Sequence, residues 1–236
     1  MRALMYADFC VARTYVTQYL LIGLIVSACS LIGVMGEGGI IPDGASLVAA
    51  GSCFLVMVCY FMLYAFFGAD EAGNWQEGRL ASLPVAPAQV VRARFALMVI
   101  VCAGALALAV PVGALVMLGI TAVKGQVVVP AVDLGTIGAL VAVAGVALVV
   151  SAAQMTALFA VGMQRGRAVV FLPFVLIMLL AIPGVEGTLG RAVATATQAL
   201  ANVPAAALAT TLVALAAATY LACMRLAQTL YARREL

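Results

Sequence analysis

Long runs of apolar residues, separated by short polar stretches, dominate the pattern along the chain. Apolar runs of about 18 residues or more are typical of helices that cross a bilayer. Six such runs predict an all-α membrane protein with a single transmembrane domain over residues 1–236. The expected spans cover approximately 19–35, 45–67, 95–122, 134–163, 168–185 and 203–224.

Three local features qualify this pattern. Pro111 lies inside the third run and is expected to kink that helix, because proline cannot donate a backbone hydrogen bond. The Ala- and Thr-rich segment 186–202 is only weakly apolar, which predicts a re-entrant or interfacial helix outside the cytoplasm. Small residues allow close helix approach in lipid, and the pairs with helical spacing are Gly23 with Ser27 and Gly162 with Gly166.

The basic residues lie mostly on one side of the predicted spans. Positive charge is enriched on the cytoplasmic side of membrane proteins, so this asymmetry predicts that both termini are cytoplasmic. It also places the polar stretch 68–94 and the turn 164–167 in the cytoplasm. Of the twelve basic residues, Lys124 and Arg191 lie on the opposite side. The other ten lie on the cytoplasmic side: Arg2, Arg13, Arg79, Arg92, Arg94, Arg165, Arg167, Arg225, Arg233 and Arg234.

Composition narrows the classes of function. Of the 236 residues, 67% are hydrophobic and 9% are charged, which excludes a soluble fold, where about a quarter are charged. The net charge of +3 is too small to indicate a nucleic-acid partner. The chain has no histidine and its six cysteines form no CxxC pair, so we expect no metal site and no thiol-redox site.

Groups that would perform chemistry or drive transport are not found where they would be needed. The nine acidic residues all lie outside the central parts of the predicted spans, which leaves no intramembrane proton relay. The sequence contains no Gly-rich phosphate loop ending in Lys-Ser or Lys-Thr. We therefore expect that this chain is not an enzyme, binds no cofactor itself, and takes energy for directional work from another polypeptide.

The cytoplasmic stretch 68–94 has the most distinctive pattern. Acidic residues at its start, the only tryptophan, Trp75, and a following arginine predict an amphipathic helix that lies along the membrane surface and ends before Pro84. Pro87 suits the first turn of the next helix. From the residues alone, two interpretations remain open: a linker in which Trp75 anchors at the lipid interface, or a helix that docks a cytoplasmic partner.

This stretch resembles the membrane subunits of ABC-2 type exporters, and in particular their short six-span permeases that work with a separate ATPase. The resemblance extends to the whole layout of spans and cytoplasmic turns. It implies a coupling helix between spans two and three that fits a groove of the ATPase. The residues that match the family pattern are Asp70, Trp75, Leu83, Pro84, Val85, Arg92 and Arg94.

The resemblance implies further partners and sites. ATP and Mg²⁺ would bind to two copies of the ATPase subunit, and a second permease, identical or different, would complete the complex in a bacterial inner membrane. Gln164, Arg165 and Arg167 would form a secondary cytoplasmic contact. The expected ATPase-docking residues are Asp70, Glu71, Trp75, Glu77, Arg79, Leu83, Pro84 and Val85.

The apolar spans favour an amphipathic or hydrophobic cargo over a sugar or an ion, and the resemblance implies a cargo such as a peptide or a drug. Few hydrogen-bonding side chains lie in the spans, and a substrate path would use them: Tyr60, Ser151, Gln154 and Thr156. One alternative function is a membrane scaffold or assembly factor that recruits a cytoplasmic partner without transport. A secondary carrier or a channel is a third alternative, which the missing intramembrane charge disfavours.

Overall fold

The computed structural model describes about three-fifths of the chain, and all of the elements in this part are helices. Its described residues contain no strand. This confirms the predicted all-α class. The described residues are 6, 18, 20–29, 44–68, 86–123, 132–162, 166, 168–169, 171 and 205–234.

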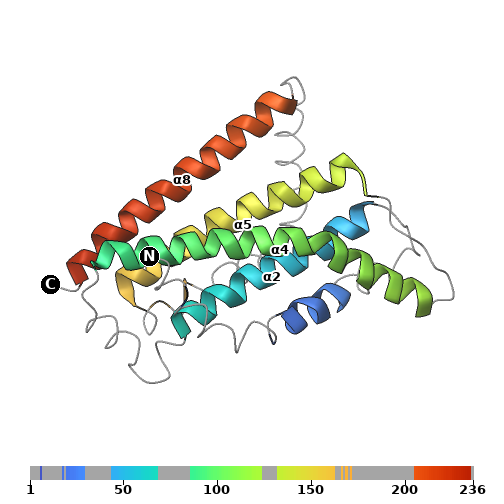
Figure 1. The fold of residues 1–236 in the computed structure, drawn as a ribbon, viewed down its shortest axis with the longest axis horizontal. Coiled ribbons are helices and arrows are strands. Elements are labelled where there is room, and N and C mark those ends of the chain that lie inside the picture. The colour runs from blue at the N-terminus through green and yellow to red at the C-terminus, as the bar shows by residue number, and fades with distance from the viewer. Residues whose placement is uncertain are drawn as a thin grey trace, which may run out of the picture.

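Four long helices account for most of the described residues (Figure 1). Each is long and apolar enough to cross a membrane, and a shorter apolar helix covers Leu20–Cys29. The other two expected spans are less well represented: 19–35 is described only through this short helix, and 168–185 lies almost wholly outside the described residues. The long helices are α2 (Gly44–Gly68), α4 (Pro87–Val123), α5 (Leu134–Val161) and α8 (Ala205–Arg234).

Two of these helices extend beyond the apolar runs that predict them. α4 has 37 residues, which at 1.5 Å per residue gives about 55 Å, well above the roughly 30 Å of a bilayer core. Its first residues therefore belong to the stretch 68–94 that was expected to be cytoplasmic. α8 continues through Arg225 to Arg234, so the basic segment after the expected sixth span is helical.

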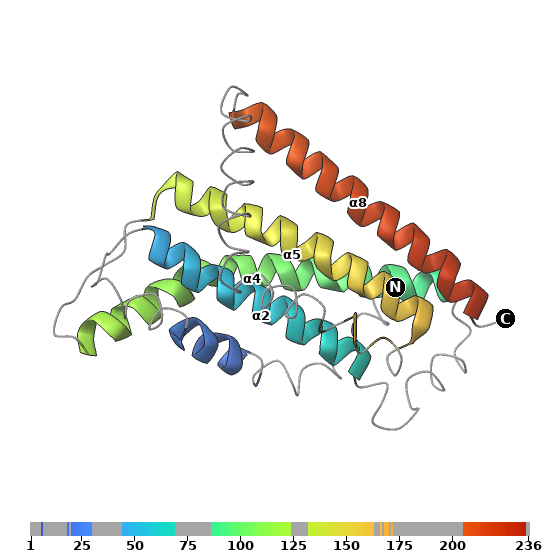
Figure 2. The same ribbon diagram turned by 180° about the vertical axis from the view of Figure 1, so that it is seen from behind.

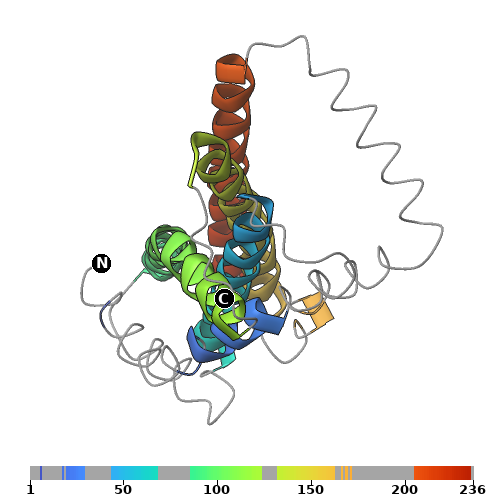
Figure 3. The same ribbon diagram turned by 90° about the vertical axis from the view of Figure 1, so that its right-hand side faces the viewer.

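The helices α2, α4 and α5 lie side by side along the long axis, and α8 joins them at one end only (Figures 1 and 2). The end of α8 meets the start of α4 and the end of α5, whereas its first half diverges from the other helices. The view along the long axis shows α4 on one side of α2 and α5, with α8 extending away beyond α5 (Figure 3). Val213, Leu215 and Leu221 of α8 are exposed.

Close contact between α2 and α4 depends on small residues. A Cβ atom at Gly51 of α2 would lie 3.1 Å from the carbonyl oxygen of Ala109, and one at Gly113 of α4 would lie 3.3 Å from that of Leu47. Glycine at these positions lets the two backbones approach without displacing side chains, as is usual where helices associate in lipid. The predicted Gly23–Ser27 pair likewise faces α2: a Cβ at Gly23 would lie 3.2 Å from the Phe54 ring.

α4 contains Pro111 within an otherwise continuous helix, and its second half bends away from the direction of its first (Figures 1 and 2). Proline has no N–H to donate to the carbonyl of Ala107, four residues earlier, and its ring crowds that carbonyl. The bend accords with the kink expected from the sequence.

Large apolar side chains lie on the outside of the bundle as well as in its core. Ile100, Leu115 and Val146 are more than half exposed. A protein in water hides side chains of this kind, whereas the surface of a transmembrane bundle faces lipid. The outer surface therefore fits a multi-pass membrane protein.

Candidate functional site

The residues expected to dock a cytoplasmic partner fall outside the described residues, and so does the expected secondary contact. The structure describes the helix ends from which these connections depart. α2 ends at Gly68 and α4 begins at Pro87. The residues concerned are Asp70, Glu71, Trp75, Glu77, Arg79, Leu83, Pro84 and Val85, and Gln164, Arg165 and Arg167.

Local features of the sequence explain why α4 begins at Pro87 and why α5 ends before Gly162. Pro87 occupies the first helical position of α4, where the missing N–H costs nothing, and the N–H of Gln89 donates to the carbonyl of Ala86 over 2.8 Å. At the end of α5, Gly162 has φ 80°, a backbone conformation that glycine adopts without steric cost. Its N–H donates to the carbonyl of Leu158.

Arg94 is the most unusual residue at this end of the bundle, because it is a charged residue with only 3% of its surface exposed. Its guanidinium carbon lies 4.8 Å from the ring centroid of Phe67, at the end of α2. The same carbon lies 5.9 Å from the ring centroid of Phe159, near the end of α5. Both distances are within the range of cation–π attraction, so Arg94 touches the ends of two other helices.

Aromatic side chains from four helices surround this arginine. Phe159 contacts Phe67 edge-on, with centroids 5.1 Å apart, and stacks near Phe95 at 6.5 Å. It also meets Tyr231 of α8 at 5.3 Å. Such offset and edge-on arrangements are the favourable geometries of aromatic pairs. We call this group the aromatic–arginine cluster: Phe67, Arg94, Phe95, Phe159, Tyr220 and Tyr231.

Tyr220 connects α8 to the cluster through both its ring and its hydroxyl. The ring meets that of Phe95 at 5.3 Å, edge-on. The hydroxyl donates to the backbone carbonyl of Phe95 over 2.6 Å. α8 is therefore attached to α4 at the point where the two helices converge.

The sequence did not reveal this cluster. Arg94 is expected there only as one of the basic residues that set topology and open the third span. The one available signal is that Phe67, Phe95 and Phe159 each lie near an end of an apolar run. Nothing in the sequence shows that these ends meet.

Three of the four polar residues expected along a substrate path lie on α5, and the fourth, Tyr60, lies on α2. The Thr156 hydroxyl donates to the carbonyl of Cys223 on α8 over 3.1 Å and to its own helix at Ala152 over 2.8 Å. The side-chain amide of Gln154 donates to the carbonyl of Val169 over 3.4 Å.

The other two path residues lie nearer to Gln154 than to Thr156. Ser151 is one turn before Gln154 on α5 and is also buried. The ring centroid of Tyr60 on α2 lies 6.5 Å from that of Phe171. Phe171 is two residues after Val169, whose carbonyl accepts the hydrogen bond from Gln154. Of the four, Thr156 joins α5 to α8 through its hydroxyl.

Comparison with known proteins decides the family. A family model described as ABC-2 family transporter protein matches residues 4–232, which is nearly the whole chain. This chain belongs to the ABC-2 transporter family. No curated protein and no solved structure gives a match.

Membership of the ABC-2 family, together with the four long apolar helices, identifies a multi-pass membrane protein with a permease role. It also implies a partnership with an ABC ATPase. In the part of the chain that the structure describes, no group of three or more metal-ligating side chains comes together.

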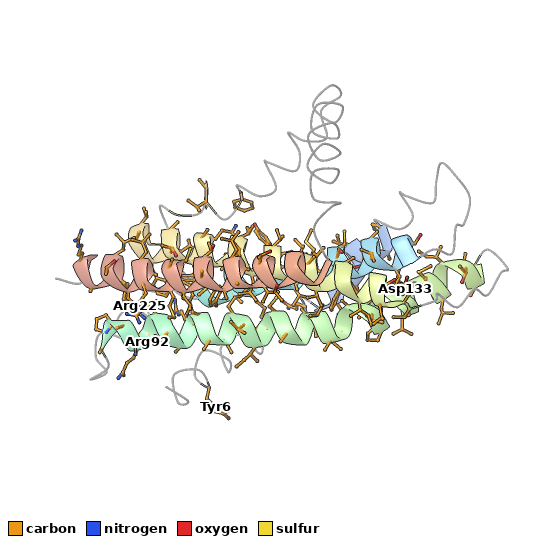
Figure 4. The ribbon with its side chains drawn as sticks, turned by 90° about the horizontal axis from the view of Figure 1, so that it is seen from above. Tyr6, Arg92, Asp133 and Arg225 are labelled. Atoms are coloured by element: carbon orange, nitrogen blue, oxygen red, sulfur yellow. The ribbon has the colours of Figure 1, made fainter. Side chains whose placement is uncertain are left out.

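The two ends of this ABC-2 protein differ in charge. Arg92 and Arg225 lie at one end of the long axis and Asp133 lies at the other (Figure 4). We call the first of these the arginine end; it also contains the aromatic–arginine cluster. At the opposite end, Asp133 caps α5: its carboxylate accepts a hydrogen bond from the N–H of Thr136 over 2.8 Å and another from the Thr136 hydroxyl. These bonds from Thr136 stabilise the carboxylate and lower the pKa of Asp133 below its usual value.

Proposed function

We propose that this chain is the membrane-spanning permease subunit of an ATP-driven exporter. A separate nucleotide-binding subunit would bind ATP and Mg²⁺ and hydrolyse the ATP, and this chain would catalyse no reaction itself. Two such subunits and two permeases would form the active complex, in a bacterial inner membrane. The cargo would be amphipathic or hydrophobic.

One observation carries the proposal beyond family membership. The ends of α2 and α5 and the start of α4 meet in the aromatic–arginine cluster. The stretch that follows α2 is the one expected to bind the ATPase, and the turn 164–167 follows α5. A cytoplasmic partner that moved either connection would therefore act on a packed junction of three helices.

The charge at the two ends supports the proposed orientation. Arg92 and Arg225 are exposed at the arginine end, and Arg233 is exposed near the end of α8. A cytoplasmic location of this end agrees with the positive-inside rule. In this proposed orientation the chain would have six spans with both termini in the cytoplasm. The docking segment 68–86 then lies on the cytoplasmic side, where an ATPase would be.

The docking assignment is tested by replacing Trp75 and Glu77 together with alanine. The permease is purified with the ATPase encoded beside it, and assembly and ATP hydrolysis are compared with wild type. We expect the double variant to lose ATPase binding while it remains folded in the membrane. Glu186→Ala, on the opposite side of the membrane in the proposed topology, is the control. Full assembly and full ATP hydrolysis in the double variant would refute the docking site.

A further inference from the structure

Residues 69–86, which join α2 to α4, form the first connection at the arginine end. The contact between Phe67 and Arg94 lies beside both ends of this connection. Residues 69–86 follow α2 and precede α4, so Phe67 lies two residues before the connection and Arg94 lies within the first two turns after it. The guanidinium of Arg94 covers the ring of Phe67 at 4.8 Å. The two helices that carry this connection are therefore joined directly at its base.

The same arginine also reaches the base of the second connection. Phe159 lies two residues before the end of α5, and its ring centroid is 5.9 Å from the Arg94 guanidinium carbon. Phe159 and Phe67 also contact each other edge-on at 5.1 Å. Arg94 thus contacts both helix ends that precede a connection, and it lies itself on the helix that follows the first.

An arginine at this junction has a property that lysine lacks, although filling the space does not require a charge. Burying a cation is unfavourable unless the surrounding groups compensate, so an apolar side chain would be the simpler means of filling this space. The planar guanidinium can lie against two aromatic faces at a fixed orientation, whereas the ammonium group of lysine is a compact, strongly hydrated point charge. The rings on either side are themselves 4% and 3% exposed, for Phe67 and Phe159.

We infer that Arg94 is a positioning residue that makes the ends of α2 and α5 move together with the start of α4 when the ATPase displaces the first connection. This inference rests on the proposed function. A displacement that begins in 69–86 would reach α4 directly along the chain, and would reach α5 through the guanidinium and Phe159. α8 would follow through Tyr231, which contacts Phe159 at 5.3 Å.

The test compares wild type, Arg94→Lys and Arg92→Lys in the complete complex with its ATPase, reconstituted in lipid nanodiscs. Hydrogen–deuterium exchange is measured with and without ATP and vanadate, which trap the hydrolytic state. Arg94→Lys keeps the charge and loses the planar stacking. Arg92→Lys is the matched control, because Arg92 is exposed on the same helix.

In wild type and in Arg92→Lys, we expect trapping to change exchange at the start of α4 and at the ends of α2 and α5. In Arg94→Lys, we expect the change at the start of α4 to persist and the change at the end of α5 to be lost. Phe159→Leu removes the ring on α5 that the guanidinium contacts and leaves Arg94 in place. If Arg94→Lys fails to assemble, Phe159→Leu is measured instead, with the same expected loss at the end of α5.

Two results would overturn the inference, and they are distinguishable. If the wild-type complex responds to trapping and both Arg94→Lys and Phe159→Leu pass the full response to α5, Arg94 does not position these helices and the proposed function is unaffected. If wild type does not assemble with the ATPase or shows no response at any helix, the proposed function fails, and this inference fails with it.

Discussion

The hydroxyl of Tyr220 on α8 donates to the backbone carbonyl of Phe95 on α4 over 2.6 Å. These two residues are 125 positions apart in the chain, and their rings also meet edge-on at 5.3 Å. The first half of α8 diverges from the bundle (Figure 1). This contact therefore helps to hold the second half of α8 against α4.

Replacing Tyr220 with phenylalanine should weaken the attachment of α8 while keeping the ring contact with Phe95. Hydrogen bonds between membrane helices contribute about 0.6 kcal/mol on average and up to about 1.7 kcal/mol. We expect a loss of about 1 kcal/mol, measured by unfolding in mixed micelles. Thr219→Val is the control, because the Thr219 hydroxyl donates to Leu215 of its own helix and is exposed. Equal stability of the two variants would contradict the role of the Tyr220 bond.

Thr156 offers a second test of how α8 is held. Its hydroxyl bonds to Cys223 on α8 as well as to its own helix. Thr156→Val should therefore reduce stability by about 0.5 to 1 kcal/mol. The matched control is Thr121→Val, since the buried hydroxyl of Thr121 donates to Met117 and Leu118 of its own helix. A loss no greater for Thr156→Val than for Thr121→Val would show that the bond to α8 contributes nothing.

The close contact of α2 and α4 makes Gly51 sensitive to any added atom. A Cβ there would meet the Ala109 oxygen at 3.1 Å and a Leu140 methyl carbon at 3.0 Å. Overpacking of this kind typically costs about 1 to 3 kcal/mol, so we expect Gly51→Ala to be destabilised in a thermal unfolding assay.

The control for Gly51 is another helical glycine with free space around it. A Cβ at Gly104 of α4 would meet no atom within 4 Å. Because alanine favours helix by up to about 1 kcal/mol over glycine, Gly104→Ala should be neutral or stabilising. If Gly51→Ala were more stable than Gly104→Ala, the α2–α4 contact would be looser than described.

The cap at Asp133 predicts a pH dependence. Its hydrogen bonds from Thr136 lower the pKa of the Asp133 carboxyl in the folded state. A lowered folded pKa means that the cap stabilises the protein above the ordinary aspartate pKa of 3.8, and that this stability is lost as the pH falls through the folded value. The effect should be small because Asp133 is exposed and screened by water.

The measurement for Asp133 compares the unfolding temperatures of wild type and Asp133→Ala at about pH 7 and about pH 3. At about pH 7 we expect wild type to unfold at a higher temperature than Asp133→Ala. At about pH 3 we expect the difference between the two unfolding temperatures to be smaller. Asp133→Asn keeps an oxygen acceptor for the Thr136 N–H without a titratable group, so its stability should change less with pH. A difference that grows on acidification would contradict the assigned cap.

The positions of the long helices could be predicted from hydropathy, because a run of apolar residues must be helical to satisfy its backbone in lipid. α2, for example, covers Gly44–Gly68 where a span was expected over 45–67. The rotation of each helix could not be predicted. α5 is apolar on all sides, so no polar face indicates which residues meet a neighbour. For this reason the sequence does not distinguish Gln154 from Thr156, although the Thr156 hydroxyl bonds to Cys223 of α8 and the Gln154 amide bonds to Val169.

The sequence by itself determined the family, the apolar helices and the asymmetry of basic residues, because each depends on residues that are close together in the chain. Only the tertiary structure decided that Arg94 lies between Phe67 and Phe159 and that α8 is held by Tyr220. These contacts join residues from different helices. They depend on how the helices rotate and cross. Close backbone approach at positions such as Gly51 and Gly113 sets this arrangement, and no local pattern in the sequence records it.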